Sequence, residues 1–178
     1  MANCLTEMVS LRKLEPSDLP FLYQWENDAS SWADASIHNP LSRQDLRDYI
    51  ASTTGDIYKD GQLRLIIEER PTANSQELTA TLGCIDLFDF DVRNRKAALG
   101  MYVAPDARGR GIGKLALQRM EEYAFGQLQL RMLYAVIATN NTACSALYRH
   151  AGYTPSSPLQ AWTLESDAVI WQKRNPNA

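Results

Sequence analysis

The sequence predicts a single α+β domain over residues 1–178, built on a mixed, mostly antiparallel sheet flanked by helices. The length of 178 residues and the apolar content of 45% suit one domain with its own hydrophobic core. Strand patterns dominate the first half of the chain after two helical segments, whereas helix, strand and helix fill the second half. This order differs from the even strand–helix alternation of a doubly wound fold.

The chain begins with a predicted strand and a predicted helix. Residues 8–14 alternate apolar and polar side chains, as a half-buried strand does. Pro16 then starts a helix, in which apolar side chains recur at helical spacing at Leu19, Leu22 and Trp25. We expect a loop with a short helix over residues 27–40.

A second helix and three strands complete the first half. Ser42 and Asp45 have the spacing of a capping box, which opens a helix that runs through Ile50. Apolar-rich runs then predict strands at residues 62–69, 78–90 and 95–103. A polar turn at 71–77 separates the first two strands, and a hairpin turn at 91–94 joins the last two.

The second half starts with a glycine-rich loop and ends with a strand pair. The same patterns predict a helix at 112–126, a strand at 132–138, a helix at 141–151 and an antiparallel pair near 153–155 and 162–173.

Composition excludes several classes of function. No run of 18 apolar residues is present and the N-terminal segment lacks a signal-peptide pattern, so we expect no membrane span and no secretion. The net charge of −3 argues against general nucleic-acid binding. Three isolated cysteines (Cys4, Cys84, Cys144) favour reduced thiols in a cytoplasmic protein, and two histidines (His38, His150) are too few for a histidine-rich metal centre.

The most informative segment is the loop that joins the strand at 95–103 to the helix at 112–126. It reads Ala-Pro-Asp-Ala-Arg-Gly-Arg-Gly from position 104, followed by Ile-Gly-Lys. Loop N–H groups and a helix N-terminus can converge on phosphate oxygens. Basic side chains also gather in this region, at Arg93, Arg95, Lys96, Arg108, Arg110 and Lys114. An acidic protein with such a cluster suits a small polyanionic ligand.

Two familiar phosphate loops fit this segment poorly. A Walker-type loop fails because Arg108 stands at its first glycine position and Leu115 follows Lys114. A dinucleotide fingerprint matches the spacing from Gly111 to Ala116, but seven residues separate that glycine from the strand. The strand at 132–138 is also followed by Thr-Asn, without the expected carboxylate. A nicotinamide enzyme therefore stays an alternative that requires NAD(P) binding.

A third pattern fits, and it introduces a family resemblance. Residues 108–113, Arg-Gly-Arg-Gly-Ile-Gly, satisfy Arg/Gln-x-x-Gly-x-Gly/Ala, and the chain here resembles the GNAT superfamily of N-acetyltransferases. Residues 141–153 resemble the GNAT segment Asn-x-x-Ala-x-x-Leu-Tyr-x-x-x-Gly-Phe, with Cys144 in place of the alanine. Residues 9–28 are similar to the opening of the branch that holds ribosomal-protein N-terminal and spermidine acetyltransferases.

The resemblance implies acetyl-CoA as co-substrate, no metal, and a sheet that splays at its central strands. It implies that the loop cradles the diphosphate and that pantetheine lies between the strands at 99–103 and 132–138. We interpret Gly100 as a bulge that frees main-chain N–H groups for the thioester carbonyl. The expected cofactor-binding residues are Met101, Tyr102, Val103, Arg108, Gly109, Arg110, Gly111, Ile112, Gly113, Lys114 and Asn141.

The resemblance also implies two catalytic roles. Tyr148 stands at the tyrosine position of the family segment, where it would protonate the leaving sulfur. The glutamate that spermidine-type members carry before the cofactor strand is replaced by Ala98. Either a chain of water molecules or another carboxylate must then accept the proton of the ammonium group. Asp86, a carboxylate in an apolar strand, is the candidate base, although it could instead pair with an arginine.

The acceptor is expected to be a primary amine: a protein N-terminus, a polyamine or another small amine. Aromatic rings and acids can receive an ammonium group, and the candidates are Trp25, Asp28, Trp32, Asp34 and Asp89. The segment 35–40 lacks the acidic cluster of spermidine enzymes. We expect direct attack in a ternary complex and consider a homodimer through the C-terminal strand edge. The alternative is a regulatory module that binds acyl-CoA without turnover.

Overall fold

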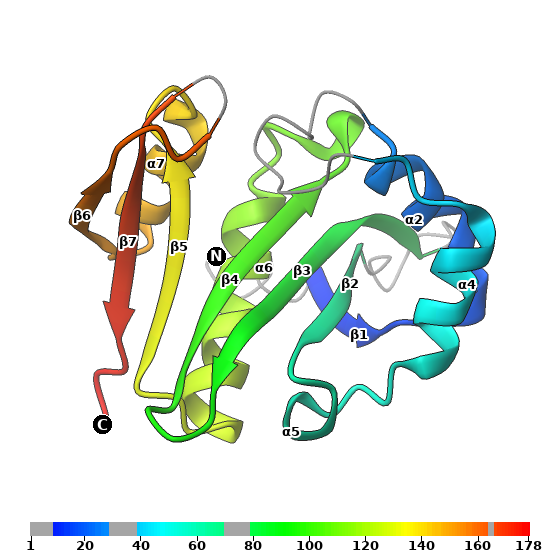
Figure 1. Cartoon of the computed structure of the whole chain (residues 1–178), viewed down its shortest axis with the longest axis horizontal. Helices are drawn as coiled ribbons and strands as arrows, with labels where there is room; N and C mark the ends of the chain where they lie inside the picture. Colours follow the sequence, from blue (N-terminus) through cyan, green and yellow to red (C-terminus); the bar gives the residue numbers. More distant parts are fainter. Residues whose placement is uncertain (1–8, 29–38, 70–78, 164–165) are drawn as a thin grey trace, which may run out of the picture.

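The fold is described from a computed structural model, which describes residues 9–28, 39–69, 79–163 and 166–178. Within these ranges, seven strands form one sheet in the order β1-β2-β3-β4-β5-β7-β6 (Figure 1). Among these described strands, β4–β5 is the only parallel pair. This mixed, mostly antiparallel sheet with helices on both faces confirms the predicted fold class. The strands are β1 (Val9–Lys13), β2 (Leu63–Glu69), β3 (Ala80–Asp91), β4 (Lys96–Val103), β5 (Met132–Ala138), β6 (Thr154–Leu159) and β7 (Ala168–Arg174).

The helices begin and end close to the predicted positions. They are η1 (Pro16–Asp18), α2 (Leu19–Glu26), α4 (Arg43–Ser52), α5 (Ile57–Asp60), η2 (Pro105–Ala107), α6 (Ile112–Glu121), the π-helical segment η3 (Glu122–Gln127) and α7 (Thr142–His150). The predicted capping box of α4 is present, since the Ser42 side chain accepts from Asp45 N and the Asp45 carboxylate accepts from Ser42 N. The polar turn at 71–77 and most of the loop at 27–40 lie outside the described residues.

Three features differ from the sequence prediction. Helix α5 was not expected, because four residues are too short to show a period. The predicted helix at 112–126 changes into a π-helical segment at Glu122. In the C-terminal pair, β6 extends to Leu159 and β7 starts only at Ala168. Strand β6 contains two prolines, and it can hold them because it is an edge strand.

Alternate side chains of the strands build two separate cores. On one face, strand residues such as Ile67 and Ile85 pack with Leu117 of α6 and Tyr148 of α7. On the other face, Ile66 and Cys84 pack with the helices α2 and α4. The amphipathic patterns of the strands and helices thus place α6 and α7 on one face and the N-terminal helices on the other.

The sheet opens between its two central strands. β4 pairs with β5 only from Lys96–Met132 to Ala98–Tyr134. β4 then continues to Val103 beside β3, and β5 continues to Ala138 beside β7. Figure 1 shows β4 and β5 close together at one end and well separated at the other. The splay that the family resemblance implied is therefore present, and it starts at Leu99.

The predicted bulge at Gly100 is wrong. Gly100 lies opposite Asp86, and the β3–β4 register is unbroken from Gly83–Val103 to Phe88–Ala98. The irregularity lies instead between Phe88 and Asp91. Main-chain groups of β4 are freed because β5 departs, and no bulge in β4 is needed.

Candidate active site

The free edge of β4 presents main-chain groups to the opening. Ala104 N donates to Leu82 O at 2.8 Å, and in an antiparallel ladder this bonded pairing recurs at every second residue. Tyr102 and Gly100 therefore bond toward β3. Met101 and Val103 direct their N–H and C=O groups away from β3, into the opening. This is the orientation that the sequence prediction required of their backbone, although it arises without a bulge.

The glycine-rich loop delivers a helix N-terminus to the same opening. Gly111 is the N-cap of α6, has a φ of 81°, and caps the helix without a side chain. The N–H groups of Ile112 and Gly113, which open the helix, have no carbonyl one turn back to bond and are available to an anion, whereas Lys114 N already donates to Gly111 O at 3.1 Å. Gly109, at φ 74°, precedes it in the same exposed loop. The loop therefore exposes backbone amides at the position where the sequence predicts the diphosphate to bind.

The three basic side chains of the loop differ in their roles. Arg108 Nε donates to Val103 O at 2.9 Å, and its guanidinium lies 5.7 Å from the centroid of the Tyr102 ring. Lys114 lies in the first turn of α6 and lines the cavity described below. Arg110 instead forms an ion pair with Glu69 at 2.6 Å and 2.7 Å. Its side chain does not line that cavity, so only its backbone remains a candidate for cofactor binding.

A cavity of about 780 Å³ runs past the free edge of β4. Its walls come from both faces of the sheet: α6 and α7 on one side, and α2, β2 and β3 on the other. The strand and loop residues that line it are Gly100, Met101, Tyr102, Val103, Ala107, Arg108, Gly109 and Gly111. The helix residues on the α6 and α7 side are Ile112, Gly113, Lys114, Asn141, Ala143, Cys144 and Leu147. The remainder are Trp25, Glu26, Arg64, Cys84 and Asp86.

Helix α7 contributes its N-terminus and a buried tyrosine. The Asn141 side chain accepts from Cys144 N at 3.1 Å, which confirms Asn141 as the N-cap. Tyr148 is only 2% exposed, and its hydroxyl lies 3.5 Å from Leu99 O. Leu99 is the first residue of β4 beyond the pairing with β5. The hydroxyl therefore lies where the opening begins, beneath the cavity wall and not on it.

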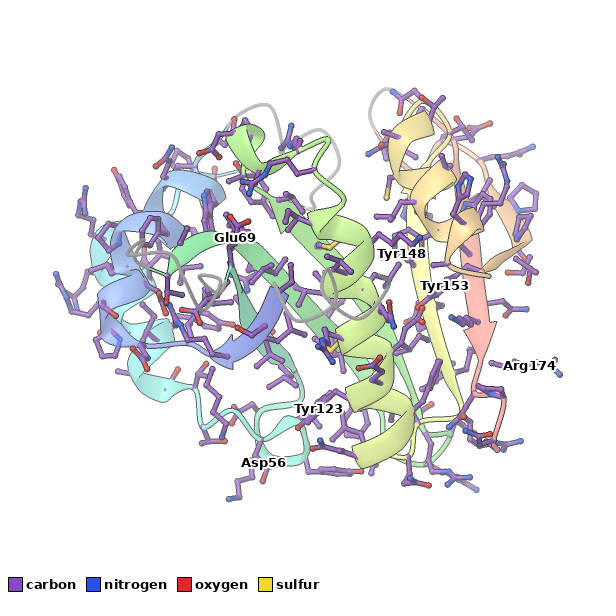
Figure 2. All side chains as sticks on the ribbon, turned by 180° about the vertical axis from the view of Figure 1, so that it is seen from behind. Asp56, Glu69, Tyr123, Tyr148, Tyr153 and Arg174 are labelled. Atoms are coloured by element: carbon purple, nitrogen blue, oxygen red, sulfur yellow. The ribbon has the colours of Figure 1, made fainter. Side chains whose placement is uncertain are left out.

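The tyrosine is held as a neutral phenol. Its ring packs edge-on against Tyr153, with centroids 4.8 Å apart, and Figure 2 shows the two rings beside α6. Burial raises the pKa of Tyr148 well above its ordinary value. The hydroxyl consequently remains protonated at neutral pH and can act as a hydrogen-bond donor.

The candidate base, Asp86, is engaged with an arginine. Arg64 Nε and Nη2 donate to the two Asp86 oxygens at 2.8 Å and 2.9 Å, and Arg64 Nη1 forms a short ion pair with Glu26. We call Glu26, Arg64 and Asp86 the Arg64 cluster. The sequence prediction had left open that Asp86 pairs with an arginine, and the structure has this pairing. It missed Glu26 and Arg64, although a charged residue within an apolar strand, as Arg64 is, carries the same signal that singled out Asp86.

The expected acceptor residues are only partly brought together. Trp25 lines the cavity, and Asp28 accepts a hydrogen bond from the Tyr102 hydroxyl at 3.3 Å. Trp32 and Asp34 lie outside the described residues. Asp89 is not at the cavity: it sits in the irregular end of β3, exposed, with a φ of 46° and the Tyr134 hydroxyl at 3.5 Å. Asp89 therefore does not line this cavity, and it lies within the irregularity between Phe88 and Asp91.

No metal centre is evident in the part of the chain that the structure describes, where no group of three histidine, cysteine or acidic side chains is suitably placed. Helices in those same ranges are also too short or too polar to cross a membrane.

Comparison with known proteins agrees with this geometry. The family model for the acetyltransferase (GNAT) domain matches residues 9–154. Spermidine N(1)-acetyltransferase of Escherichia coli (strain K12) is 24% identical over 154 residues, which are 85% of this chain and 75% of that protein. A Bacillus subtilis protein provisionally named a ribosomal N-acetyltransferase is 32% identical over 71 residues, 40% of this chain and 39% of that one.

Solved structures share the fold. Spermidine N-acetyltransferase from Vibrio cholerae, crystallised with CoA and spermine, superposes with a TM-score of 0.81 at 21% identity, and the match covers 95% of this chain and 96% of that chain. The family match spans most of the sequence, including the glycine-rich loop and α7. The chain therefore belongs to the GNAT family and is an N-acetyltransferase.

Proposed function

We propose that residues 1–178 form one catalytic domain that transfers an acetyl group from acetyl-CoA to a small primary amine by direct attack in a ternary complex. The observation that carries this proposal is one continuous cavity that passes the free edge of β4 and is lined by residues from both faces of the sheet. A donor bound on the α6 and α7 side and an acceptor bound on the α2 side would meet at that edge. Proximity and alignment are most of what an activated thioester needs from the protein.

The donor side has the right chemistry for CoA. Amides from Gly109 to Gly113, with the side chains of Arg108 and Lys114, would hold the diphosphate. The N–H groups of Met101 and Val103 would donate to the thioester carbonyl and to the oxyanion that forms from it. Asn141 would act indirectly, by fixing the start of α7 against the cavity. Acetyl-CoA supplies the activated acyl group, and a metal is not part of this proposal.

Tyr148 is proposed to assist the leaving sulfur. Its phenol stays protonated because burial raises its pKa, and it lies where β4 and β5 begin to separate. This hydroxyl would give its proton to the departing thiolate, and the resulting phenolate would recover through water the proton that the amine nitrogen releases on forming the amide. We propose no covalent acyl-enzyme, since the amine can attack directly.

The acceptor amine is proposed to lose its proton through water. Both Asp86 oxygens already accept from Arg64, so Asp86 is better suited to attract the ammonium group than to take its proton. Relatives named as spermidine acetyltransferases support a small polyamine as the first acceptor to test. A protein N-terminus and other small amines remain candidates.

The proposal is tested by thiol release and calorimetry. Acetyl-CoA should bind to the purified protein, and free thiol should appear when amines are added from a panel of polyamines, amino acids, aminoglycosides and short peptides. Binding without thiol release across the whole panel would contradict catalysis and favour the regulatory module instead, a reading that the alanine at position 98 keeps open. Cytoplasmic location and a homodimer remain predictions, the latter to be tested by light scattering.

A further inference from the structure

On the acceptor side of the cavity, three directly opposed residues form a row across three neighbouring strands. Arg64 of β2 lies opposite Asp86 of β3, which lies opposite Gly100 of β4. Directly opposed residues project to the same face of a sheet. All three line the cavity. This row of residues therefore extends from the Arg64 cluster to the free edge of β4, where the thioester would lie.

Gly100, the β4 residue of this row, has no side chain to cover the strand beside Asp86. A Cβ at this position would come within 3.2 Å of Phe88 Cε1, so β4 has little room for a side chain here. The next residue of β4 on the same face toward the hairpin is Ala98, which is also small. Trp25 and Tyr102, whose ring centroids lie 5.5 Å apart, also line the cavity. A small acceptor group can thus approach the β4 edge beside Asp86.

The charges of the Arg64 cluster do not cancel. One guanidinium contacts two carboxylates, Asp86 through both oxygens and Glu26 through one. The three side chains are between 13% and 21% exposed, so solvent screens them only in part. The guanidinium also lies 5.6 Å from the centroid of the Tyr49 ring. The formal charges of the three side chains, one cation and two anions, sum to −1 on the wall of the cavity.

We propose that Arg64 is the positioning residue of the acceptor site: it holds the carboxylates of Glu26 and Asp86 together, with Asp86 opposite Gly100, and together they receive the ammonium group of a primary amine. The proposal rests on the proposed function for the identity of the acceptor. Arg64 itself does not touch the acceptor in this account. A planar guanidinium can hold two carboxylates at fixed geometry, which a lysine ammonium does less well.

Removing the guanidinium would change the ionisation of the pair. Two partly buried carboxylates without a cation repel each other, so one of them would hold a proton up to a higher pH. Among the residues that the structure describes, the other titratable groups facing the cluster are Tyr49 from α4, Cys84 from β3 and Tyr102 from β4, whose hydroxyl bonds to Asp28. Burial raises the pKa of all three, so they stay protonated between pH 6 and 8.

The test measures amine binding without turnover. Calorimetry would give the Kd of spermidine and of n-butylamine for the CoA-saturated protein at pH 6 and pH 8. For the wild type we expect similar affinities at both values. For Arg64→Gln we expect at least tenfold weaker binding at pH 6 than at pH 8, and a CoA affinity within twofold of the wild type. Arg64→Lys should retain pH-independent binding because the cation remains.

Arg12→Gln is the matched control. Arg12 also bridges two carboxylates, Asp18 at 2.6 Å and 2.7 Å and Glu68 at 2.5 Å, but it does not line the cavity. It should lower stability without changing amine binding or its pH dependence. Asp86→Asn serves if Arg64→Gln does not fold, because it leaves the cluster without net charge and should weaken amine binding at least tenfold.

Two results would overturn the inference: wild-type protein that binds neither amine, or Arg64→Gln and Asp86→Asn with wild-type affinity at both pH values. Amine binding that depends on Arg64, with no thiol release, would instead contradict the proposed function and leave the inference standing.

Discussion

Replacing Gly111 by alanine separates backbone strain from ligand binding. Gly111 has a φ of 81°, and a Cβ added there would meet no heavy atom within 4 Å. The cost to folding is therefore the left-handed backbone alone, about 1–2 kcal/mol for a residue with a Cβ. If the amides around Gly111 hold the diphosphate, the methyl group also intrudes on the anion. Losing one hydrogen bond to a charged group costs about 1.5–3 kcal/mol. We thus expect CoA to bind roughly 10- to 150-fold more weakly.

Gly61 provides a control with nearly the same backbone. It caps the end of α5 at a φ of 71°, and a Cβ there also meets nothing within 4 Å. Gly61→Ala should lower the free energy of unfolding by a similar amount, measured in urea, and leave the CoA affinity from calorimetry unchanged. Equal CoA affinities for Gly61→Ala and Gly111→Ala would refute the assignment of the diphosphate to this loop.

Two further predictions concern buried ionisable side chains. Tyr148→Phe should lower kcat by roughly 100-fold or more, the usual range for losing a proton donor, with unchanged CoA affinity. Tyr153→Phe, which removes the neighbouring buried hydroxyl, should leave kcat within a few-fold; equal effects would argue for packing alone. Glu121 is partly buried, and this burial raises its pKa above the ordinary 4.5 despite an ion pair with Lys173 at 2.6 Å. The Glu121 contribution to stability is therefore present below pH 4.5 and declines as pH rises through the higher folded pKa. In urea unfolding, wild type should lose stability relative to Glu121→Gln between pH 4.5 and 8, and a constant difference would be inconsistent with the raised pKa.

Local signals allowed much of the fold to be predicted. The strand at 132–138 coincides with β5, and the capping box at Ser42 and the cap at Asn141 are present. These features depend on residues close together in sequence. The glycine-rich loop belongs to the same class, because its φ values and the helix that follows are encoded within about ten residues.

The features that sequence reasoning missed depend on long-range register. The Arg64 cluster joins residues from α2, β2 and β3, and only the β2–β3 register sets Arg64 opposite Asp86. The Arg110 side chain is held by Glu69, a residue 41 positions away. Asp89 lies within the irregularity between Phe88 and Asp91 and does not line the cavity, and periodicity carries no sign of such a register shift.

The central claim is that CoA binds along the free edge of β4, with its diphosphate at the start of α6. A crystal structure of the protein with CoA tests this most directly. We expect the diphosphate within hydrogen-bond distance of the amides from Gly109 to Gly113, and the thiol arm between β4 and β5 beyond Ala98. A structure in which CoA lies elsewhere, or in which β5 pairs with β4 as far as Val103, would contradict the account.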